Sequence, residues 1–284
     1  MAHIGDWLRA RAITSSLACS ILVVILAMGM VACGGGGASP SGGPTSTASD
    51  PFANPAITGK FRISDGRMVA LECWGAGSPT IILEPGDQDA GLARFTRSPL
   101  ATILVTQTRV CAYDRPGLGE SDAAPVRPRD ADDAVRDLDG VLTAAKVGEP
   151  YLLVGSSFGG FIALFYASSH PEKVAGVVLL DVPPPPKTPD PAGPPAWDAP
   201  DNREHFNFLA GFDARINKAG VPIKAPLTVV TASQGQSDQK DQSRWLKFSS
   251  DADAVLLEGG HVIYRDNPDG VANVIKAMLK RIKG

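Results

Sequence analysis

The stretch that most constrains the fold of this chain is residues 151–160, which read YLLVGSSFGG. Residues 151–154 form a short apolar run of β-branched and aromatic character, and an apolar segment with helical spacing follows the glycines. This order predicts a strand, a sharp turn and a helix, with Ser157 at the tip of the turn. Small residues two positions before and after Ser157 allow close packing of the helix on the strand. Such a turn lifts the serine clear of the sheet, above the N-terminus of the helix.

The remainder of the chain alternates strands and helices around this turn. The expected strands span residues 60–64, 67–75, 79–83, 108–113, 151–154, 174–180, 227–231 and 254–257. The expected helices span residues 129–146, 159–169 and 269–283, with one further helix around residues 203–218. The Asp65-Gly66 pair predicts a hairpin turn between the first two strands. Alternation of this kind predicts a mostly parallel sheet with helices on both faces.

Three motifs give the sequence a family resemblance. They are CAYDRPGLGESD at residues 111–122, GSSFGG at 155–160 and EGGHVIYRDNP at 258–268. In this order and spacing they resemble the α/β-hydrolase superfamily of esterase- and lipase-like serine hydrolases, from about residue 60 to the C-terminus. GSSFGG is similar to the nucleophile elbow of that superfamily. The resemblance implies an α/β-hydrolase fold, with a mostly parallel eight-stranded sheet and a small lid insertion at about residues 182–226, hereafter the insertion segment.

A serine nucleophile needs a base within hydrogen-bond reach. The chain has four histidines, so elimination identifies a candidate. His3 lies in the leader, His170 at the end of a helix and His205 in the insertion segment. His261 follows the last expected strand, at the sheet edge where Ser157 must emerge. We therefore expect His261 to be the catalytic base.

The acid that would orient His261 has two main candidates. Most of the superfamily carries this acid a few residues after the seventh strand, where Gly235 stands in this sequence. Asp238, or less plausibly Asp241, could serve there if the loop is longer. Other branches place the acid directly after the sixth strand, where Asp181 stands. We favour Asp181, with Asp238 as the alternative.

Acyl transfer also requires two N–H groups that face the developing oxyanion. The resemblance implies that one is the backbone N–H of Phe158, directly after the nucleophile. The second is expected from the loop after the third strand, where Pro85 cannot donate. The N–H of Asp87 is the candidate, with Gln88 as the alternative.

The N-terminal segment predicts export. Two arginines precede an apolar stretch at residues 13–31. It ends in Met-Val-Ala-Cys at residues 30–33, which resembles the lipobox of bacterial lipoproteins. We therefore expect residues 1–32 to be a signal peptide, Cys33 to be lipidated, and residues 33–55 to be a flexible tether. The catalytic domain, residues 56–284, would then lie in the periplasm or outside the cell, attached to a bacterial membrane. An uncleaved membrane helix is the alternative.

Composition and cysteine positions limit the partners. The formal net charge of −3 gives no indication of nucleic-acid binding. No Cys/His cluster has metal-ligand spacing, so we expect no metal and no cofactor. In the superfamily's strand order, Cys73 and Cys111 fall in adjacent strands, and export would permit a disulfide between them. Whether they are bonded is left open, as is the oligomeric state.

The insertion segment carries the aromatic residues Trp197, Phe206, Phe208 and Phe212. They either line an apolar substrate pocket or pack the insertion against the body of the domain. The expected function is cleavage of a small-molecule carboxylic ester through an acyl-enzyme intermediate. Other serine-dependent reactions of the superfamily (aminopeptidase, thioesterase, carbon–carbon hydrolase) are alternatives. A binding or sensory protein on the same scaffold is the alternative outside the enzymes.

Overall fold

The computed structural model describes residues 50–183, 196–213, 215–216 and 221–283. The predicted signal peptide, Cys33 and most of the predicted tether lie outside these residues. Among the described residues, no helix combines the length and the apolar composition needed to cross a membrane.

Eight strands form one sheet in the order β1-β2-β4-β3-β5-β6-β7-β8. The strands are β1 (Ile57–Arg62), β2 (Met68–Trp74), β3 (Thr80–Glu84), β4 (Val110–Tyr113), β5 (Tyr151–Ser156), β6 (Val174–Leu180), β7 (Leu227–Gln234) and β8 (Ala252–Gly260). Only β2 pairs antiparallel with its neighbours, β1 and β4, and the remaining pairs are parallel. The predicted fold class, a mostly parallel eight-stranded sheet, is confirmed.

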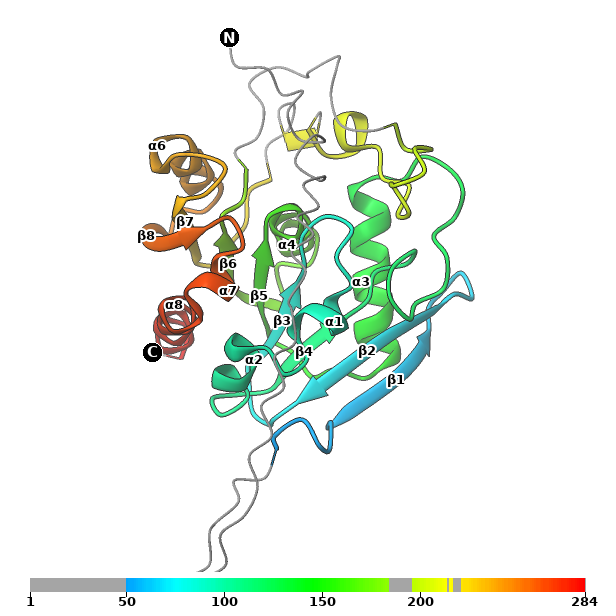
Figure 1. Cartoon of the computed structure of the whole chain (residues 1–284), viewed down its shortest axis with the longest axis horizontal. Coiled ribbons are helices and arrows are strands. Elements are labelled where there is room, and N and C mark those ends of the chain that lie inside the picture. Colours follow the sequence, from blue (N-terminus) through cyan, green and yellow to red (C-terminus); the bar gives the residue numbers. More distant parts are fainter. Residues whose placement is uncertain (1–49, 184–195, 214, 217–220, 284) are drawn as a thin grey trace, which may run out of the picture. The chain divides into compact units, whose positions relative to one another are not determined.

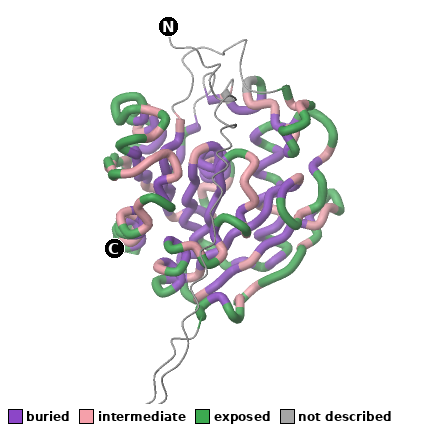
Figure 2. The backbone as a smooth tube through the Cα atoms, viewed as in Figure 1, coloured by how far each residue is buried: buried purple, intermediate pink, exposed green. Residues whose placement is uncertain are grey.

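Burial along the strands follows from this topology. Every residue of β3, β4 and β5 is buried, as expected for central strands that are covered on both faces. The edge strand β1 is mainly exposed, and its antiparallel pairing with β2 needs no crossover helix. Figure 2 shows this arrangement as a buried centre with exposed segments around it.

Helices cover both faces of the sheet (Figure 1). The helices are α1 (Gly91–Phe95), α2 (Pro99–Leu104), α3 (Ala131–Ala144), α4 (Phe158–Ser169), α6 (Gln239–Gln242), α7 (Ile263–Asp266) and α8 (Pro268–Arg281), with a π-helix at Leu209–Asp213 and a 3₁₀-helix at Ser243–Phe248. Residues of α3 and α4 share one hydrophobic core, and residues of α2 and α8 share a second. Helix α3 begins with a capping box, in which Asp130 and Asp133 each accept a hydrogen bond from the other's backbone N–H.

Three expectations about the elements need correction. The helix expected around residues 203–218 begins later, because residues 203–207 are not helical and a π-helix spans Leu209–Asp213. Helices α1 and α2 were not expected, because each spans only one or two turns and so has little helical periodicity. Residues 50–55, which the sequence analysis placed in the tether, contact the catalytic domain. Phe52 is buried against Trp74, with ring centroids 5.2 Å apart, and Asp50 pairs with Arg97.

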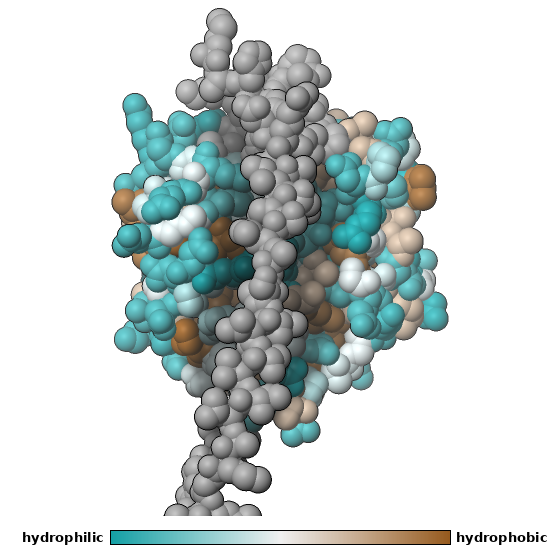
Figure 3. All heavy atoms as spheres, viewed as in Figure 1, coloured by the Kyte–Doolittle hydropathy of each residue, from teal (hydrophilic) through white to brown (hydrophobic). Residues whose placement is uncertain are grey.

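One face of the described residues is mostly polar. The face drawn in Figure 3 is predominantly hydrophilic, with separate apolar spots. The large apolar side chains that are strongly exposed among the described residues are Val126 and Leu256. Two side chains in different segments do not form a broad apolar surface, so the apolar residues serve mainly in the two cores.

Cys73 and Cys111 form a disulfide between β2 and β4. The two residues are direct partners in the antiparallel register, and both are fully buried. The pairing that the sequence left open is therefore present in the structure. It closes a loop of 38 residues that contains β3, α1 and α2.

Reduction of this disulfide is expected to lower the free energy of unfolding by about 2–4 kcal/mol, because the unfolded chain regains the entropy of the closed loop. Urea denaturation of the protein with and without dithiothreitol measures the difference in the free energy of unfolding. The variant with both Cys73→Ala and Cys111→Ala is the control, since the reductant should not change its stability. An equal response of the two proteins to dithiothreitol would contradict the prediction.

Candidate active site

Ser157 lies at the tip of a strained turn between β5 and α4. Its backbone is in the left-handed region, with φ 51° and ψ −125°, a conformation that costs a non-glycine residue on the order of 1–3 kcal/mol. The glycines explain how the chain closes this turn. A Cβ on Gly155 would lie 2.6 Å from the Gly159 carbonyl oxygen, and one on Gly159 would lie 2.5 Å from that of Glu84. The predicted strand, turn and helix are thus present, with the hydroxyl above the first turn of α4.

His261 lies between β8 and α7, within hydrogen-bond distance of Ser157 and Asp181. Its Nε2 is 2.9 Å from Ser157 Oγ, and its Nδ1 is 2.6 Å from Asp181 Oδ2. A carboxylate only accepts hydrogen bonds, so Nδ1–H donates to Asp181 and Nε2 is free to accept from the serine hydroxyl. This is the tautomer that a general base for Ser157 requires.

Asp181 directly follows β6 and is fully buried, with φ 46°. Besides His261, its carboxylate accepts hydrogen bonds from the N–H groups of Ala232 and Gln236 and from Nε2 of Gln242 at 2.6 Å. Burial alone would raise the pKa of Asp181, but these hydrogen bonds, led by that of His261, hold it below its ordinary value. Asp181 is therefore ionised and oriented at neutral pH.

The second acid candidate lies elsewhere. Asp238 is exposed and caps α6, where its side chain accepts from the Asp241 N–H at 2.7 Å. Gly235, at the position where the superfamily usually has its acid, lies against Asp181 instead. A Cβ there would be 2.4 Å from both carboxylate oxygens of Asp181. The glycine therefore leaves the space that the Asp181 carboxylate occupies.

Gln242 is a residue of the site that the sequence analysis missed. It is fully buried, donates to Asp181 and accepts from the Thr231 hydroxyl. Its position on a four-residue helix, far from any of the three motifs, gave no signal in the sequence. A buried polar side chain at that place is explained by the carboxylate it satisfies.

The other two histidines of the described residues lie away from Ser157. His170 is the C-cap of α4 and contacts Tyr166 and Glu172. His205 has Nδ1 2.9 Å from the Trp197 carbonyl oxygen and lines a separate cavity of about 480 Å³. Neither has a hydrogen bond to the serine, which agrees with the elimination from sequence.

Residues 85–88, which the sequence analysis expects to supply the second oxyanion donor and which are hereafter called the oxyanion loop, lie beside Ser157. A Cβ on Gly86 would be 3.6 Å from Ser157 Cβ. The Phe158 N–H belongs to the first turn of α4, where helical N–H groups have no intrahelical partner. Asp87 is exposed to water, yet desolvation by the surrounding protein, together with Glu204, raises the pKa of its carboxyl to about 6. Near that pH the side chain is partly neutral, which lessens its repulsion of an oxyanion.

The aromatic side chains of the insertion segment pack mainly against the nucleophile helix. Phe206 and Phe212 are buried, and both contact the Phe158 ring, with centroids 5.5 and 5.0 Å away. Phe208 is half-buried on the same ring, and Trp197 lies instead against His205. For Phe206 and Phe212 the packing interpretation is the one that the geometry supports.

Glu84, the last residue of β3, is a fully buried carboxyl directly before the oxyanion loop. Among the described residues neither of its oxygens has a hydrogen-bond partner, and Arg115 lies 3.8 Å away. Burial raises the pKa of Glu84 to about 7, although Arg115 and the nearby Tyr113 hydroxyl oppose the rise. The group is thus poised between its neutral and ionised forms near neutral pH.

We expect Glu84→Gln to stabilise the protein at high pH and to leave it unchanged near pH 4.5. Between the ordinary pKa of 4.5 and the raised value of about 7, the unfolded chain releases a proton that the native protein keeps. The wild type therefore loses stability as pH rises through this window, by up to about 3 kcal/mol, and the glutamine variant does not. Urea denaturation at pH 5 and pH 8.5 tests this, with the exposed Glu120→Gln as control. Parallel pH profiles of the wild type and Glu84→Gln would disprove it.

Residues 97–212 match a family model described as alpha/beta hydrolase fold. Among curated proteins, the chain is 36% identical over 110 residues to a pimeloyl-[acyl-carrier protein] methyl ester esterase of Chromobacterium violaceum, a match that covers 39% of each chain. It is 35% identical over 108 residues to a 2-hydroxy-6-oxononadienedioate/2-hydroxy-6-oxononatrienedioate hydrolase of Paraburkholderia phymatum, covering 37% of each. The matches thus span well under half of these relatives.

Solved structures resemble the chain over a longer range. A hydrolase from Pseudomonas aeruginosa superimposes with a TM-score of 0.65 and 19% identity, covering 80% of this chain and 99% of that one. At this identity the likeness concerns the arrangement of strands and helices, which extends well beyond the segment that the sequence matches cover.

Proposed function

We propose that this chain, which has the α/β-hydrolase fold, is a serine hydrolase that cleaves a carboxylic ester through an acyl-enzyme. The observation that carries the proposal is the hydrogen-bonded series from Ser157 through His261 to Asp181, with distances of 2.9 and 2.6 Å. A nucleophile, a base and an acid that orients the base are the groups that acyl transfer requires.

In the proposed reaction, Ser157 Oγ attacks the ester carbonyl carbon while its proton passes to His261 Nε2. Asp181 stabilises the imidazolium that forms, and the N–H groups of Phe158 and Asp87 face the oxyanion. The tetrahedral intermediate then expels the alcohol, whose oxygen takes the proton from His261. Water repeats the sequence on the acyl-enzyme, releases the acid and restores the serine.

We favour esters as substrates because one similar protein is named a methyl ester esterase. The hydrogen bond between Ser157 and His261 supports a serine nucleophile for such a reaction. Another similar protein is named a hydrolase of 2-hydroxy-6-oxononadienedioate, so carbon–carbon bond hydrolysis is the second candidate. Both reactions use a carbonyl electrophile near the serine, and they differ in the bond that breaks.

A panel of p-nitrophenyl esters of graded acyl length tests the proposal. We expect a burst of p-nitrophenol equal to the enzyme concentration, followed by slower turnover, because hydrolysis of the acyl-enzyme should be slower than its formation from an activated ester. A vinylogous 1,5-diketone substrate, assayed beside the panel, detects the second candidate. Folded protein that turns over neither substrate class would favour the binding or sensory alternative.

The proposal extends to location: the protein is exported and attached to a membrane through lipid on Cys33. It is supported by the apolar stretch at residues 13–31, the Met-Val-Ala-Cys junction and the Gly/Ser-rich stretch that follows. Two acyl chains, at about 0.8 kcal/mol per buried CH₂, suffice for stable attachment.

For this anchor we expect the mature protein to begin at Cys33 with added acyl mass, as measured by intact-mass spectrometry of the membrane fraction from the expressing bacterium. Cys33→Ser should leave the precursor unacylated. A membrane-bound wild type that still carries Met1 would show instead that the apolar stretch remains as a membrane helix.

A further inference from the structure

Arg115 is a buried residue that connects the segment after β4, the oxyanion loop and the insertion segment. It follows β4 in the chain, and its side chain is 2% exposed. The guanidinium donates through Nη1 to the Pro85 carbonyl oxygen at 2.8 Å and through Nη2 to the Gly86 carbonyl oxygen at 2.7 Å. These carbonyls belong to the oxyanion loop, so a single side chain fixes two successive peptide groups beside Ser157.

The hydrogen bond to Gly86 has a geometric consequence for the neighbouring N–H. The Gly86 carbonyl and the Asp87 N–H belong to the same planar peptide group, in which a trans bond makes them point in opposite directions. By holding the carbonyl toward itself, Arg115 directs the Asp87 N–H away from itself. Since Gly86 lies against Ser157, Arg115 thereby sets the direction of the N–H that is proposed as the second oxyanion donor.

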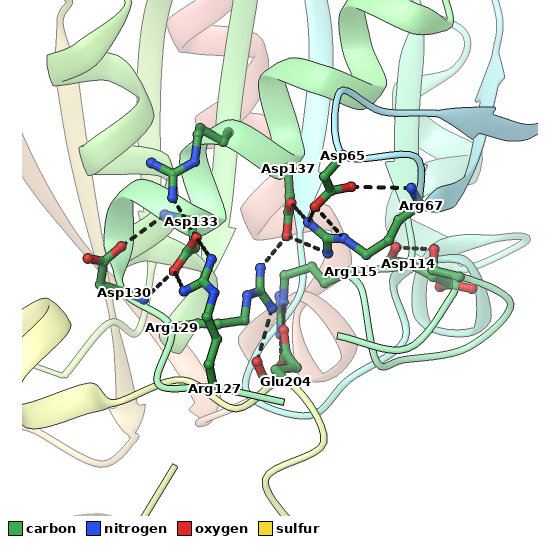
Figure 4. A network of polar contacts seen from close by, with 12 residues as sticks. Asp65, Arg67, Asp114, Arg115, Arg127, Arg129, Asp130, Asp133, Asp137 and Glu204 are labelled. Carbon is green, nitrogen blue, oxygen red and sulfur yellow. Dashed lines mark hydrogen bonds and ion pairs between the residues drawn. The ribbon is translucent and has the colours of Figure 1, made fainter. Parts of the chain in front are cut away.

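Glu204 of the insertion segment holds Arg115 in turn. It is fully buried and accepts from Arg115 Nε at 2.6 Å and from Nη2 at 3.0 Å, the two-point pairing shown in Figure 4. Gln88 of the oxyanion loop also reaches the insertion segment. Its side chain donates to Glu204 at 3.4 Å and accepts from the Arg203 N–H at 3.1 Å.

Residues 204, 205 and 207 of the insertion segment are hydrogen-bonded to Arg129, which directly precedes the N-cap of α3. Arg129 donates to the Glu204 carbonyl oxygen at 3.0 Å, and its main chain exchanges hydrogen bonds with His205 and Asn207 on either side of Phe206. The Arg129 guanidinium pairs with Asp137 of α3. Glu204 therefore has a fixed position from which to orient Arg115.

We propose that Arg115 is a positioning residue for the oxyanion loop, and that Glu204 makes the catalytic geometry of this loop depend on the insertion segment. The inference rests on the proposed serine hydrolase function. It adds that Glu204, a residue of the insertion segment, contributes to transition-state stabilisation through a buried ion pair, without contact with the substrate. Arg115 remains charged in this position, because Glu204 and Glu84 raise its pKa although burial opposes them.

A purely structural ion pair would give a different result from a positioning one. Loss of a structural pair lowers stability and leaves the kinetics of the remaining folded molecules unchanged. Loss of a positioning pair lowers kcat and the affinity for tetrahedral analogues, while KM changes little. The comparison therefore needs variants that fold, for which Arg115→Lys and Glu204→Gln keep most of the buried volume.

The experiment measures p-nitrophenyl butyrate kinetics, the affinity for phenylboronic acid and amide hydrogen exchange on the full chain. We expect Arg115→Lys to lower kcat and boronic acid affinity by about 10²-fold, and Glu204→Gln to lower both by about tenfold, with KM nearly unchanged. Exchange at residues 86–88 should rise in both variants. Arg67→Lys, in the same polar network but without contact to the oxyanion loop, should match the wild type.

Folded Arg115→Lys with wild-type kcat, boronic acid affinity and exchange would overturn the inference. Faster exchange at residues 86–88 with unchanged kcat would also overturn it, since the loop would then be held without consequence for catalysis. If the wild type neither turns over the ester nor binds the boronic acid, the proposed function fails. The exchange data alone then decide whether Arg115 and Glu204 hold the loop.

Discussion

Ser157→Ala is expected to lower kcat for ester hydrolysis by about 10⁶-fold, because the reaction loses the atom that forms the acyl-enzyme. The fold should persist. Alanine at φ 51° carries the same backbone strain as serine, and the only polar contact of the hydroxyl among the described residues is with His261. Steady-state kinetics on the best p-nitrophenyl ester, with circular dichroism on the same sample, measure both quantities.

Ser156→Ala is the matched control for this variant. Ser156 is the preceding residue, is buried at the end of β5 and makes no hydrogen bond with His261. We expect its activity to stay near that of the wild type. If Ser157→Ala retained substantial turnover, or if Ser156→Ala lost as much, the role given to Ser157 would be incorrect.

Asp181→Asn is expected to lower kcat by about 10⁴-fold while leaving KM nearly unchanged. An amide can donate to His261 Nδ1, which favours the tautomer with its proton on Nε2, and that ring cannot accept the serine proton. It also cannot stabilise the imidazolium by charge. Ala232 and Gln242 donate to the other oxygen, Oδ1, which the asparagine keeps, so the side chain should remain in place.

Asp238→Asn provides the comparison for this substitution. Asn caps a helix as well as Asp, so the cap on α6 should survive and activity should be unchanged. Collapse of activity in Asp238→Asn, with Asp181→Asn near wild type, would mean that the acid comes from the loop after β7. The two variants assayed side by side therefore decide between the candidates that the sequence left open.

The nucleophile and the base were predictable from sequence because their signals are local. Ser157 lies within five residues that close a characteristic turn, and His261 remained after elimination among four histidines. The strands were recognisable for a similar reason. Buried parallel strands such as β5 and β6 are short apolar runs that end at turn residues.

The acid could only be ranked, because its position depends on packing that no short motif records. Asp181 and Asp238 each follow an expected strand. The sequence does not show that Gly235, which has no side chain, makes room for the Asp181 carboxylate. The four hydrogen-bond donors to Asp181 likewise come from segments remote in the chain. These are tertiary properties.

The roles of Arg115 and Glu204 were even harder to predict from sequence than that of the acid. Arg115 lies in a recognised motif but has no evident role there, and Glu204 is one acidic residue in an irregular insertion. They are separated by 89 residues and meet only in the folded protein, where Arg115 donates to the Glu204 carboxylate. Buried ion pairs of this kind become visible only in three dimensions.

The measurement that tests the central claim most directly is covalent labelling with a fluorophosphonate probe, mapped by tandem mass spectrometry. We predict one label per molecule on Ser157, at a rate that falls sharply in Asp181→Asn and in His261→Ala, because the probe reports an activated serine. Folded wild type that stays unlabelled, or that carries the label on another residue, would contradict the assignment of this site as a serine hydrolase centre.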